Sequence, residues 1–271
     1  MPTTMDRVND HYKEALDYFA EDRIVGIFLQ GSQNYGLQIP GSDVDTKLIV
    51  TPTFEEIAMN RQPVSTTHIR ANEEHIDFKD IRLYVQTFRK QNLNFLEILF
   101  TDYKYINPMY EKEWKKLIAN REKIARMNPV RAVQSMKGIA MEKYHAMKHE
   151  YPSKVEVLKI HGYDPKQLHH LLRVEEFLGR YMGGERYEDC LRPLTVQKLV
   201  DVKLGLLSLP QAEKEADRSK ARIEIMSEQF RKYNQEQEDP EALEILHDVQ
   251  LNIMRTAISE ELKHLVLVPR L

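Results

Sequence analysis

The chain has 271 residues, of which 42% are apolar and 30% charged, a composition typical of a globular protein with a sizeable core. Its formal net charge of −3 argues weakly against a surface built mainly for nucleic acid. The one cysteine, Cys190, cannot build a disulfide framework or a thiolate metal cage. Because the first residues have no apolar signal-peptide core and no apolar run approaches about 18 residues, we expect no membrane span and a cytoplasmic protein.

The N-terminal part of the sequence has the pattern of a small α/β unit. Apolar residues at helical spacing predict a first helix over residues 6–20. Short apolar runs bounded by turn residues predict three strands, at residues 23–29, 46–50 and 75–78. Glycine and proline predict a loop over residues 34–42, whereas residues 53–71 fit no single pattern.

The rest of the chain has helical periodicity. Asp80 is placed to cap a helix whose apolar face begins at Ile81, and Asp164-Pro165 has the N-cap and first-turn residues of another helix. Further helices are predicted over residues 93–100, 108–126, 129–148, 193–204, 211–234 and 240–265. We therefore predict an α/β fold with a small mixed sheet in residues 1–105, followed by an α-helical domain in residues 106–271.

Two aspartates flank a valine in Asp43-Val44-Asp45, directly before the second apolar run. Strands disfavour aspartate, and side chains at positions i and i+2 of a strand project from the same face. Two neighbouring carboxylates repel each other unless a cation neutralises them, and Mg²⁺ binds such hard oxygens together with substrate phosphates. If the strand that carries Asp77 lies beside this one, three carboxylates converge and can hold two metals for an in-line displacement at phosphorus.

Gly31-Ser32, directly after the first strand, has the residues of a phosphate-binding turn. Glycine lets the backbone approach a ligand closely, and backbone N–H groups and a serine hydroxyl can bind phosphate. The alternative is that the Gly-Ser pair is an ordinary turn, that Asp43 belongs to a cap and that Asp45 lies on an exposed edge. An isolated Asp-x-Asp favours that alternative, whereas the whole combination favours a site for metal and phosphate.

The order of these residues resembles a known signature. Gly-Ser, ten residues and then Asp-Val-Asp is similar to the pattern of the DNA polymerase β-type nucleotidyltransferase superfamily. Its members transfer a nucleoside monophosphate from a nucleoside triphosphate to a hydroxyl group. The resemblance implies that Gly31 and Ser32 bind the triphosphate. It also implies that Asp43 and Asp45 bind Mg²⁺ or Mn²⁺.

The superfamily pattern includes a third carboxylate, for which the sequence offers two candidates. Asp77 lies in the strand-like run 75–78, whereas Asp80 has the position of a helix cap. We therefore favour Asp77 as the third catalytic, metal-binding residue.

A second motif lies in Tyr163-Asp-Pro-Lys and the residues that follow it. On a helix, Lys166, His170 and Arg173 fall at positions i, i+4 and i+7 and share one face, which suits phosphate binding. His169 is expected on a different face. A solvated basic stripe is the alternative interpretation.

Together with Asn34-Tyr35-Gly36 and the segment 92–100, this motif resembles a family of bacterial and phage predicted nucleotidyltransferases that are associated with RNA repair. The resemblance extends over roughly residues 24–230. It implies that Lys166, His170 and Arg173 contact the nucleotide and that the helical domain closes over the active site. The association with RNA implies an RNA end, such as that of tRNA, as the acceptor.

Some residues near these motifs have two interpretations. Lys47 shares the strand face of Asp43 and Asp45, so it either points to phosphates or pairs with an acidic neighbour. Tyr35 either stacks on a nucleotide or packs in the core. Arg131 and Lys137 lie on a helix at other spacings, and the sequence does not place them in the site.

The sequence thus predicts a metal-dependent nucleotidyltransferase that releases pyrophosphate from a nucleoside triphosphate, with an RNA end as the favoured acceptor. One alternative is nucleotidylation of a protein or of a small molecule. Another is a non-catalytic protein that binds and senses nucleotide. No motif indicates the preferred base or the oligomeric state.

Overall fold

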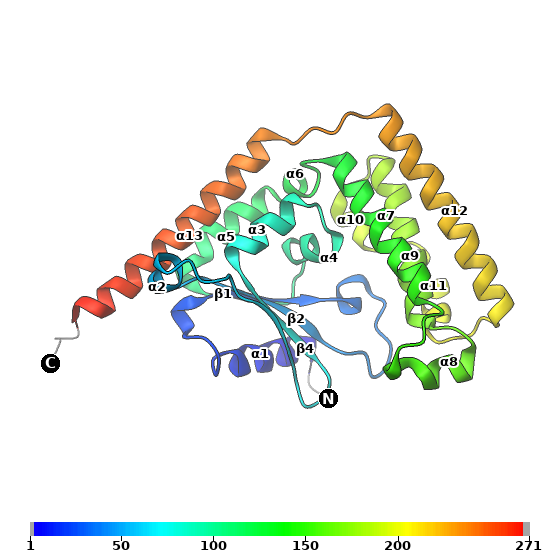
Figure 1. The fold of residues 1–271 in the computed structure, drawn as a ribbon, viewed down its shortest axis with the longest axis horizontal. Coiled ribbons are helices and arrows are strands. Elements are labelled where there is room, and N and C mark those ends of the chain that lie inside the picture. The colour runs from blue at the N-terminus through cyan, green and yellow to red at the C-terminus, as the bar shows by residue number, and fades with distance from the viewer. Residues whose placement is uncertain (1–2, 268–271) are drawn as a thin grey trace.

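The computed structural model describes residues 3–267 and has the mixed α/β architecture that the sequence predicts (Figure 1). In the described residues, one sheet has the strand order β3-β4-β2-β1-β5. The strands are β1 Ile24–Gln30, β2 Asp45–Val50, β3 Ser65–Ile69, β4 His75–Asp80 and β5 Lys104–Ile106. Strands β2 and β4 are parallel and the other pairs are antiparallel, so the sheet is mixed.

Most of the predicted helices are present with shifted ends, whereas the predicted helix over residues 108–126 is divided in two, and the short helices at 54–58, 155–161 and 187–191 were not predicted. The helices of the N-terminal part are α1 Thr4–Ala15, α2 Phe54–Ala58, α3 Ile81–Arg89 and α4 Leu93–Leu96. Those that follow are α5 Glu111–Ala119, α6 Arg121–Ala125, α7 Pro129–Ala146, α8 Val155–His161, α9 Pro165–Met182, α10 Tyr187–Leu191, α11 Val196–Lys203, α12 Leu209–Tyr233 and α13 Pro240–Leu267. The three predicted strands are confirmed, whereas β3 and β5 were not predicted because β3 exposes most of its side chains and β5 has only 3 residues.

Both predicted helix caps are present. Asp164 is the N-cap of α9, where its carboxylate accepts the N–H of Lys166 at 2.9 Å and Pro165 occupies the first turn. Asp80 caps α3 in the same way and also binds the Arg82 guanidinium at 2.6 Å. These caps fix where α9 and α3 begin, and α9 is the helix that carries the predicted basic face.

The two faces of the sheet are covered differently. Helix α1 covers one face, where Val44, Leu48 and Val50 pack with Val8 of the helix. On the other face, Ile49 joins a larger core with residues of α3, α5, α7, α9 and α13. Successive residues of β2 therefore face α1 and the helical part alternately, as the pleat of a strand requires.

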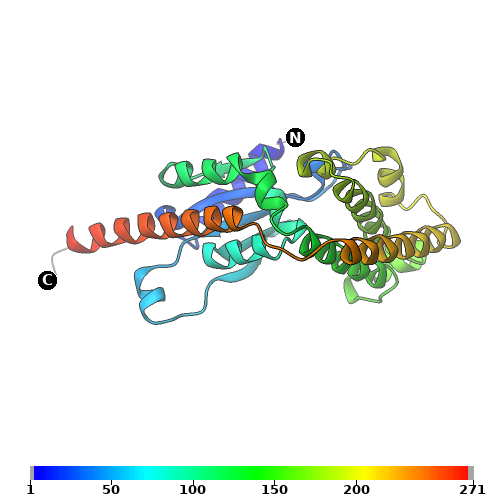
Figure 2. The same cartoon turned by 90° about the horizontal axis from the view of Figure 1, so that it is seen from above.

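The helical part lies beside the sheet and returns to it. Helices α7, α9, α11 and α12 pack together, and α13 then runs back along α3 and α5 (Figures 1 and 2). One apolar core continues from Val25 of β1 to Ile253 of α13. The division into two domains at residue 105 stays a prediction.

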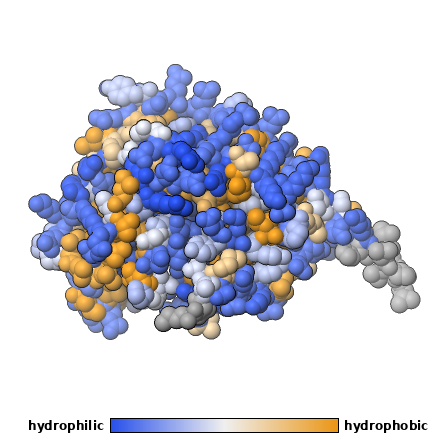
Figure 3. Space-filling model, turned by 180° about the vertical axis from the view of Figure 1, so that it is seen from behind, coloured by the Kyte–Doolittle hydropathy of each residue, from blue (hydrophilic) through white to orange (hydrophobic). Residues whose placement is uncertain are grey.

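In the described part of the chain, no helix has the length and apolar composition needed to cross a membrane. The face of the molecule shown in Figure 3 mixes hydrophilic and hydrophobic residues.

Candidate active site

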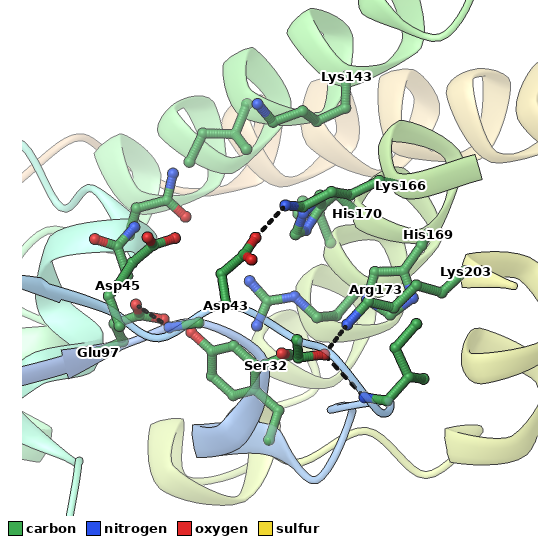
Figure 4. A pocket seen from close by; sticks show the side chains of 18 of the residues that line it. Ser32, Asp43, Asp45, Glu97, Lys143, Lys166, His169, His170, Arg173 and Lys203 are labelled. Atoms are coloured by element: carbon green, nitrogen blue, oxygen red, sulfur yellow. Dashed lines mark hydrogen bonds and ion pairs between the residues drawn. The ribbon is translucent and has the colours of Figure 1, made fainter. Parts of the chain in front are cut away.

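A cavity of about 400 Å³ lies where the turn after β1 and the start of β2 meet helices α7, α9 and α11 (Figure 4). Most of the predicted site residues line it: Gly31, Ser32, Asp43, Asp45, Lys166, His170 and Arg173. Segments that are more than 120 residues apart in sequence thus meet in one place. The exception among the predicted residues is Asp77.

The turn at Gly31 depends on a backbone conformation that glycine adopts most easily. Gly31 has φ +104° and ψ −156°, a region that residues with a Cβ rarely occupy. A Cβ built there would lie more than 4 Å from the other residues that the structure describes, so conformation rather than space selects glycine. The Gly31 N–H donates to Oε1 of Glu97 at 3.3 Å, and the Thr101 hydroxyl donates to Oδ1 of Asn34 at 2.7 Å. Both contacts hold the turn against the cavity.

Asp43 and Asp45 both reach the cavity, as predicted from their spacing. Asp45 begins β2 and Asp43 precedes it, and their side chains are 53% and 36% exposed. Asp45 Oδ1 accepts the backbone N–H of His75 at 3.0 Å. Asp43 points across the cavity to Lys166, with 3.7 Å between Oδ2 and Nζ (Figure 4). The exposed carboxylate oxygens leave room for a further ligand.

Asp77 is not among the residues that line the cavity, and its carboxylate pairs with Lys47 instead. The register of β2 and β4 places Asp77 beside Lys47, and their Nζ and Oδ2 atoms are 3.0 Å apart. The Thr67 hydroxyl donates to its other oxygen at 2.8 Å. Burial lowers the pKa of Lys47, and the charge of Asp77 opposes that shift. Lys47 therefore pairs with an acidic neighbour, which was one of its two interpretations.

The predicted convergence of three carboxylates is thus not what the structure contains. Among the described residues, no three side chains of histidine, cysteine, aspartate or glutamate lie close enough to hold a metal together. Asp80, the other candidate, is the cap of α3 and lies in an ion pair with Arg82. Only Asp43 and Asp45 of the predicted acidic residues line the cavity.

The basic face of α9 is turned into the cavity as its spacing predicts. Arg173 is only 7% exposed, yet its Nε and Nη1 atoms have no hydrogen-bond partner within the described chain. Its guanidinium lies 4.0 Å from the centre of the Tyr35 ring, so Tyr35 packs beneath it. Burial holds the pKa of His170 well below its usual value, and the charge of Arg173 adds to this shift. His170 is therefore a neutral group at physiological pH.

His169 was expected on a different face, but it lines the cavity too. Its Nδ1 lies 2.8 Å from the carbonyl oxygen of Leu199, and this contact turns the ring between α9 and α11. Because a carbonyl only accepts, Nδ1 carries the proton. Burial lowers the pKa of His169 to about 4. Two neutral imidazoles thus border the cavity.

Further charged residues line the cavity that the sequence did not predict. Glu97 is 2% exposed, and burial raises its pKa to about 8 although the charge of Arg173 opposes that shift. Lys203 donates to the carbonyl of Leu37 at 3.0 Å, and Lys143 enters from α7. A glutamate inside the apolar run 93–100 was a visible signal, whereas nothing in the sequence distinguished these two lysines from many others.

Two basic residues that the sequence could not place lie outside the cavity lining. Arg131 pairs with Glu236 at 3.0 Å, and Lys137 lies 4.0 Å from Glu228. Their charges are therefore used in contacts to the chain around α12.

Comparisons with known proteins give little beyond this geometry. No protein-family model matches the chain, and no curated protein matches it. Among solved structures, the chain is similar to the crystal structure of a nucleotidyltransferase-like protein from Exiguobacterium sibiricum. The two are 12% identical, the alignment covers 84% of this chain and 76% of that one, and the TM-score is 0.29.

Proposed function

We propose that this chain is a metal-dependent nucleotidyltransferase, which transfers a nucleoside monophosphate from a nucleoside triphosphate to a hydroxyl group and releases pyrophosphate. One observation carries the proposal. The buried Arg173 guanidinium, whose Nε and Nη1 have no hydrogen-bond partner among the described residues, lines the same cavity as the Asp43 and Asp45 carboxylates. A buried cation without a hydrogen-bonding partner is costly, which favours an anionic ligand in that place.

The charges of the cavity indicate what kind of anion fits. Carboxylates stand on the side of β2, and cations stand on the side of the helices, namely Lys143, Lys166, Arg173 and Lys203. A free polyanion would be repelled by the aspartates, and a free divalent cation would be repelled by the lysines. A complex of a divalent cation with a triphosphate satisfies both sides. The volume of about 400 Å³ is within the range of sites that hold molecules of nucleotide size.

The residues present fit a magnesium ion. Asp43 and Asp45 offer hard, partly exposed oxygens, and Mg²⁺ in such sites is held by one or two carboxylates and by substrate phosphates. These two residues would hold the metal, which when bound supplies Lewis-acid polarisation of the phosphoryl group. Mn²⁺ has the same ligand preference and would serve as well.

The other residues would bind and orient the triphosphate. Arg173 has the fork geometry for two parallel hydrogen bonds to phosphate oxygens, and Tyr35 beneath it keeps the fork in place. Lys166 would leave Asp43 for a phosphate oxygen when the metal takes its place. Gly31 and Ser32 would offer the backbone and the hydroxyl at the turn, and neutral His170 would donate or accept a hydrogen bond.

An RNA end is the favoured acceptor, and it rests on the family resemblance rather than on charge, since the net charge is −3. If RNA is the acceptor, the affinity for tRNA should fall with increasing salt as phosphate contacts are screened.

A labelling experiment tests both parts. The protein is incubated with Mg²⁺ or Mn²⁺ and each α-labelled nucleoside triphosphate in turn, with cellular RNA and cellular protein as separate acceptors. Label in the RNA fraction, together with pyrophosphate release, is the expected result, and the Asp43→Asn/Asp45→Asn variant should give none. Label in the protein fraction alone would show that a protein, and not RNA, is the acceptor. Nucleotide binding without any pyrophosphate release would contradict transfer and favour a sensor.

A further inference from the structure

Glu74 is a buried carboxylate that no sequence motif singled out. It lies in the polar turn Asn72-Glu73-Glu74 between β3 and β4, where exposed side chains are the rule. Instead it is 1% exposed and inserts beneath the start of β2. A carboxylate removed from water to this extent needs several donors around it.

The donors come from the residue before β2, from helix α1 and from the turn itself. Oε1 of Glu74 accepts the Val44 N–H at 3.1 Å, and Oε2 lies 2.9 Å from Nε2 of His11. Arg70 and Asn72 donate to Oε2 at 3.0 and 2.8 Å. Arg7 of α1 forms a further ion pair with Oε1.

His11 extends this network to the next residue of the strand. Burial lowers the pKa of His11 to about 4, so the ring is neutral at physiological pH. Because the carboxylate of Glu74 only accepts, Nε2 of His11 carries the proton and Nδ1 is free to accept. The Thr46 hydroxyl lies 2.9 Å from Nδ1 and donates to it. Helix α1 therefore reaches Thr46 through one side chain.

The anchored positions alternate with the aspartates. Arg7 Nη1 donates to the Ser42 carbonyl at 3.2 Å, Glu74 accepts from Val44, and His11 accepts from Thr46. Positions 42, 44 and 46 are thus held from the side of α1, and the intervening Asp43 and Asp45 line the cavity. The residue after Glu74 donates its own N–H to Asp45 Oδ1. A shift of Glu74 would move the backbone on which both carboxylates stand.

We infer that Glu74 is a positioning residue for the Asp43 and Asp45 pair, and that with Arg7 and His11 it sets the geometry in which the pair binds a divalent cation. This inference rests on the proposed function, because it assumes that the pair is a metal site. Outer-sphere partners of this kind orient ligands and commonly change metal affinity by about 10- to 100-fold when they are replaced.

The test measures metal binding directly. Mn²⁺ affinity is measured by the loss of the free-ion electron paramagnetic resonance signal in the absence of nucleotide, because a triphosphate would itself bind the ion. Glu74→Gln keeps the shape but cannot accept from all the surrounding donors, and we expect it to weaken Mn²⁺ binding about 10-fold or more. Backbone amide exchange at Val44 should be faster in the same variant.

The control is Glu238→Gln, which removes a less buried carboxylate, with 21% of its side chain exposed, from its 3.0 Å ion pair with Arg89, away from the cavity lining. It should leave Mn²⁺ affinity unchanged. If Glu74→Gln fails to fold, Arg7→Ala replaces it, because this side chain is 30% exposed and touches both Ser42 and Glu74. Arg7→Ala should weaken Mn²⁺ binding as well.

The outcomes separate the two claims. Wild-type affinity for Mn²⁺ in Glu74→Gln, or in Arg7→Ala when that replaces it, would overturn the positioning role while the proposed function stands. Equal Mn²⁺ binding by the wild type and by the Asp43→Asn/Asp45→Asn variant would instead overturn the metal site, and the inference with it.

Discussion

The two faces of strand β2 are built in opposite ways. On the face toward α1, Leu48 is buried in apolar contacts, and the Val44 N–H and the Thr46 hydroxyl have partners. On the face toward the helices, Asp43 and Asp45 are partly exposed. One strand thus has a buried side that stabilises the fold and a side with partly exposed carboxylates that faces a cavity.

The cavity side also contains a buried positive charge. Across the cavity from the aspartates, Arg173 is buried without a hydrogen-bond partner for Nε or Nη1 in the described residues. Unpaired buried charge costs free energy of folding, and such costs are concentrated at functional sites. We therefore expect changes on the α1 face to lower stability, and changes on the cavity face to lower activity with little loss of stability.

The largest effect is expected from the carboxylates themselves. Asp43→Asn or Asp45→Asn should lower the rate of nucleotidyl transfer on the order of 1,000-fold or more, because polarisation by the metal contributes several kcal/mol. Both side chains are partly exposed, so the thermal midpoint should hardly change. Single-turnover rates and thermal melts measure the two quantities. Wild-type turnover in either variant would rule out the metal site.

The opposite result is expected at Leu48, on the face of β2 that is turned toward α1. Leu48→Ala removes a fully buried side chain from the α1 face and should lower the free energy of unfolding by about 2–5 kcal/mol. Denaturant titration measures this loss. The KM for the nucleoside triphosphate, measured below the unfolding transition, should stay at the wild-type value. A large change in KM with unchanged stability would show that the α1 face of β2 serves nucleotide binding rather than stability.

Arg173 offers the sharpest separation of binding from stability. Arg173→Met should weaken binding of a nucleoside triphosphate analogue roughly 10- to 100-fold, because it removes charge-assisted hydrogen bonds of about 1.5–3 kcal/mol. It should leave the free energy of unfolding unchanged or higher, since the unpaired buried charge is gone. Calorimetry and denaturant titration check the two halves. Arg173→Lys is the control, because lysine keeps the charge but lacks the forked guanidinium. A loss of stability in both variants would contradict the claim that Arg173 serves ligand binding rather than folding.

The smallest effect on the free energy of unfolding is expected from a change of one pH unit. Glu97 holds its proton in the folded protein up to about pH 8, whereas the unfolded chain releases it near 4.5. The folded state therefore binds more protons between these values, and stability falls as pH rises through this window, by at most about 1.4 kcal/mol per pH unit. Glu97→Gln should remove this slope while still accepting the Gly31 N–H. Equal slopes for the two proteins would show that Glu97 ionises freely.

Sequence patterns predicted those parts of the fold and the site that local rules determine. The spacing of Lys166, His170 and Arg173 identified the basic face of α9, because Asp164 and Pro165 fixed the start of that helix. The spacing of Asp43 and Asp45 predicted their common side for the same kind of reason.

What the sequence did not predict depends on register and burial. Asp77 has the right residue type and lies on the right strand, but the pairing of β2 with β4 places it beside Lys47. Glu74 belongs to a polar turn, and only the packing of α1 on the sheet shows that it is buried. Strand register and long-range packing are not local properties, so spacing alone could not supply them.

The most direct test of the account is the affinity of the wild-type protein for a non-hydrolysable nucleoside triphosphate, measured by calorimetry with Mg²⁺ and again with a chelator. We predict binding at least about 10-fold tighter with the metal, because the ion joins the phosphates to Asp43 and Asp45. The Asp43→Asn/Asp45→Asn variant should lose this difference. Equal affinity with and without the metal in the wild-type protein would contradict the claim that the cavity binds a metal–triphosphate complex.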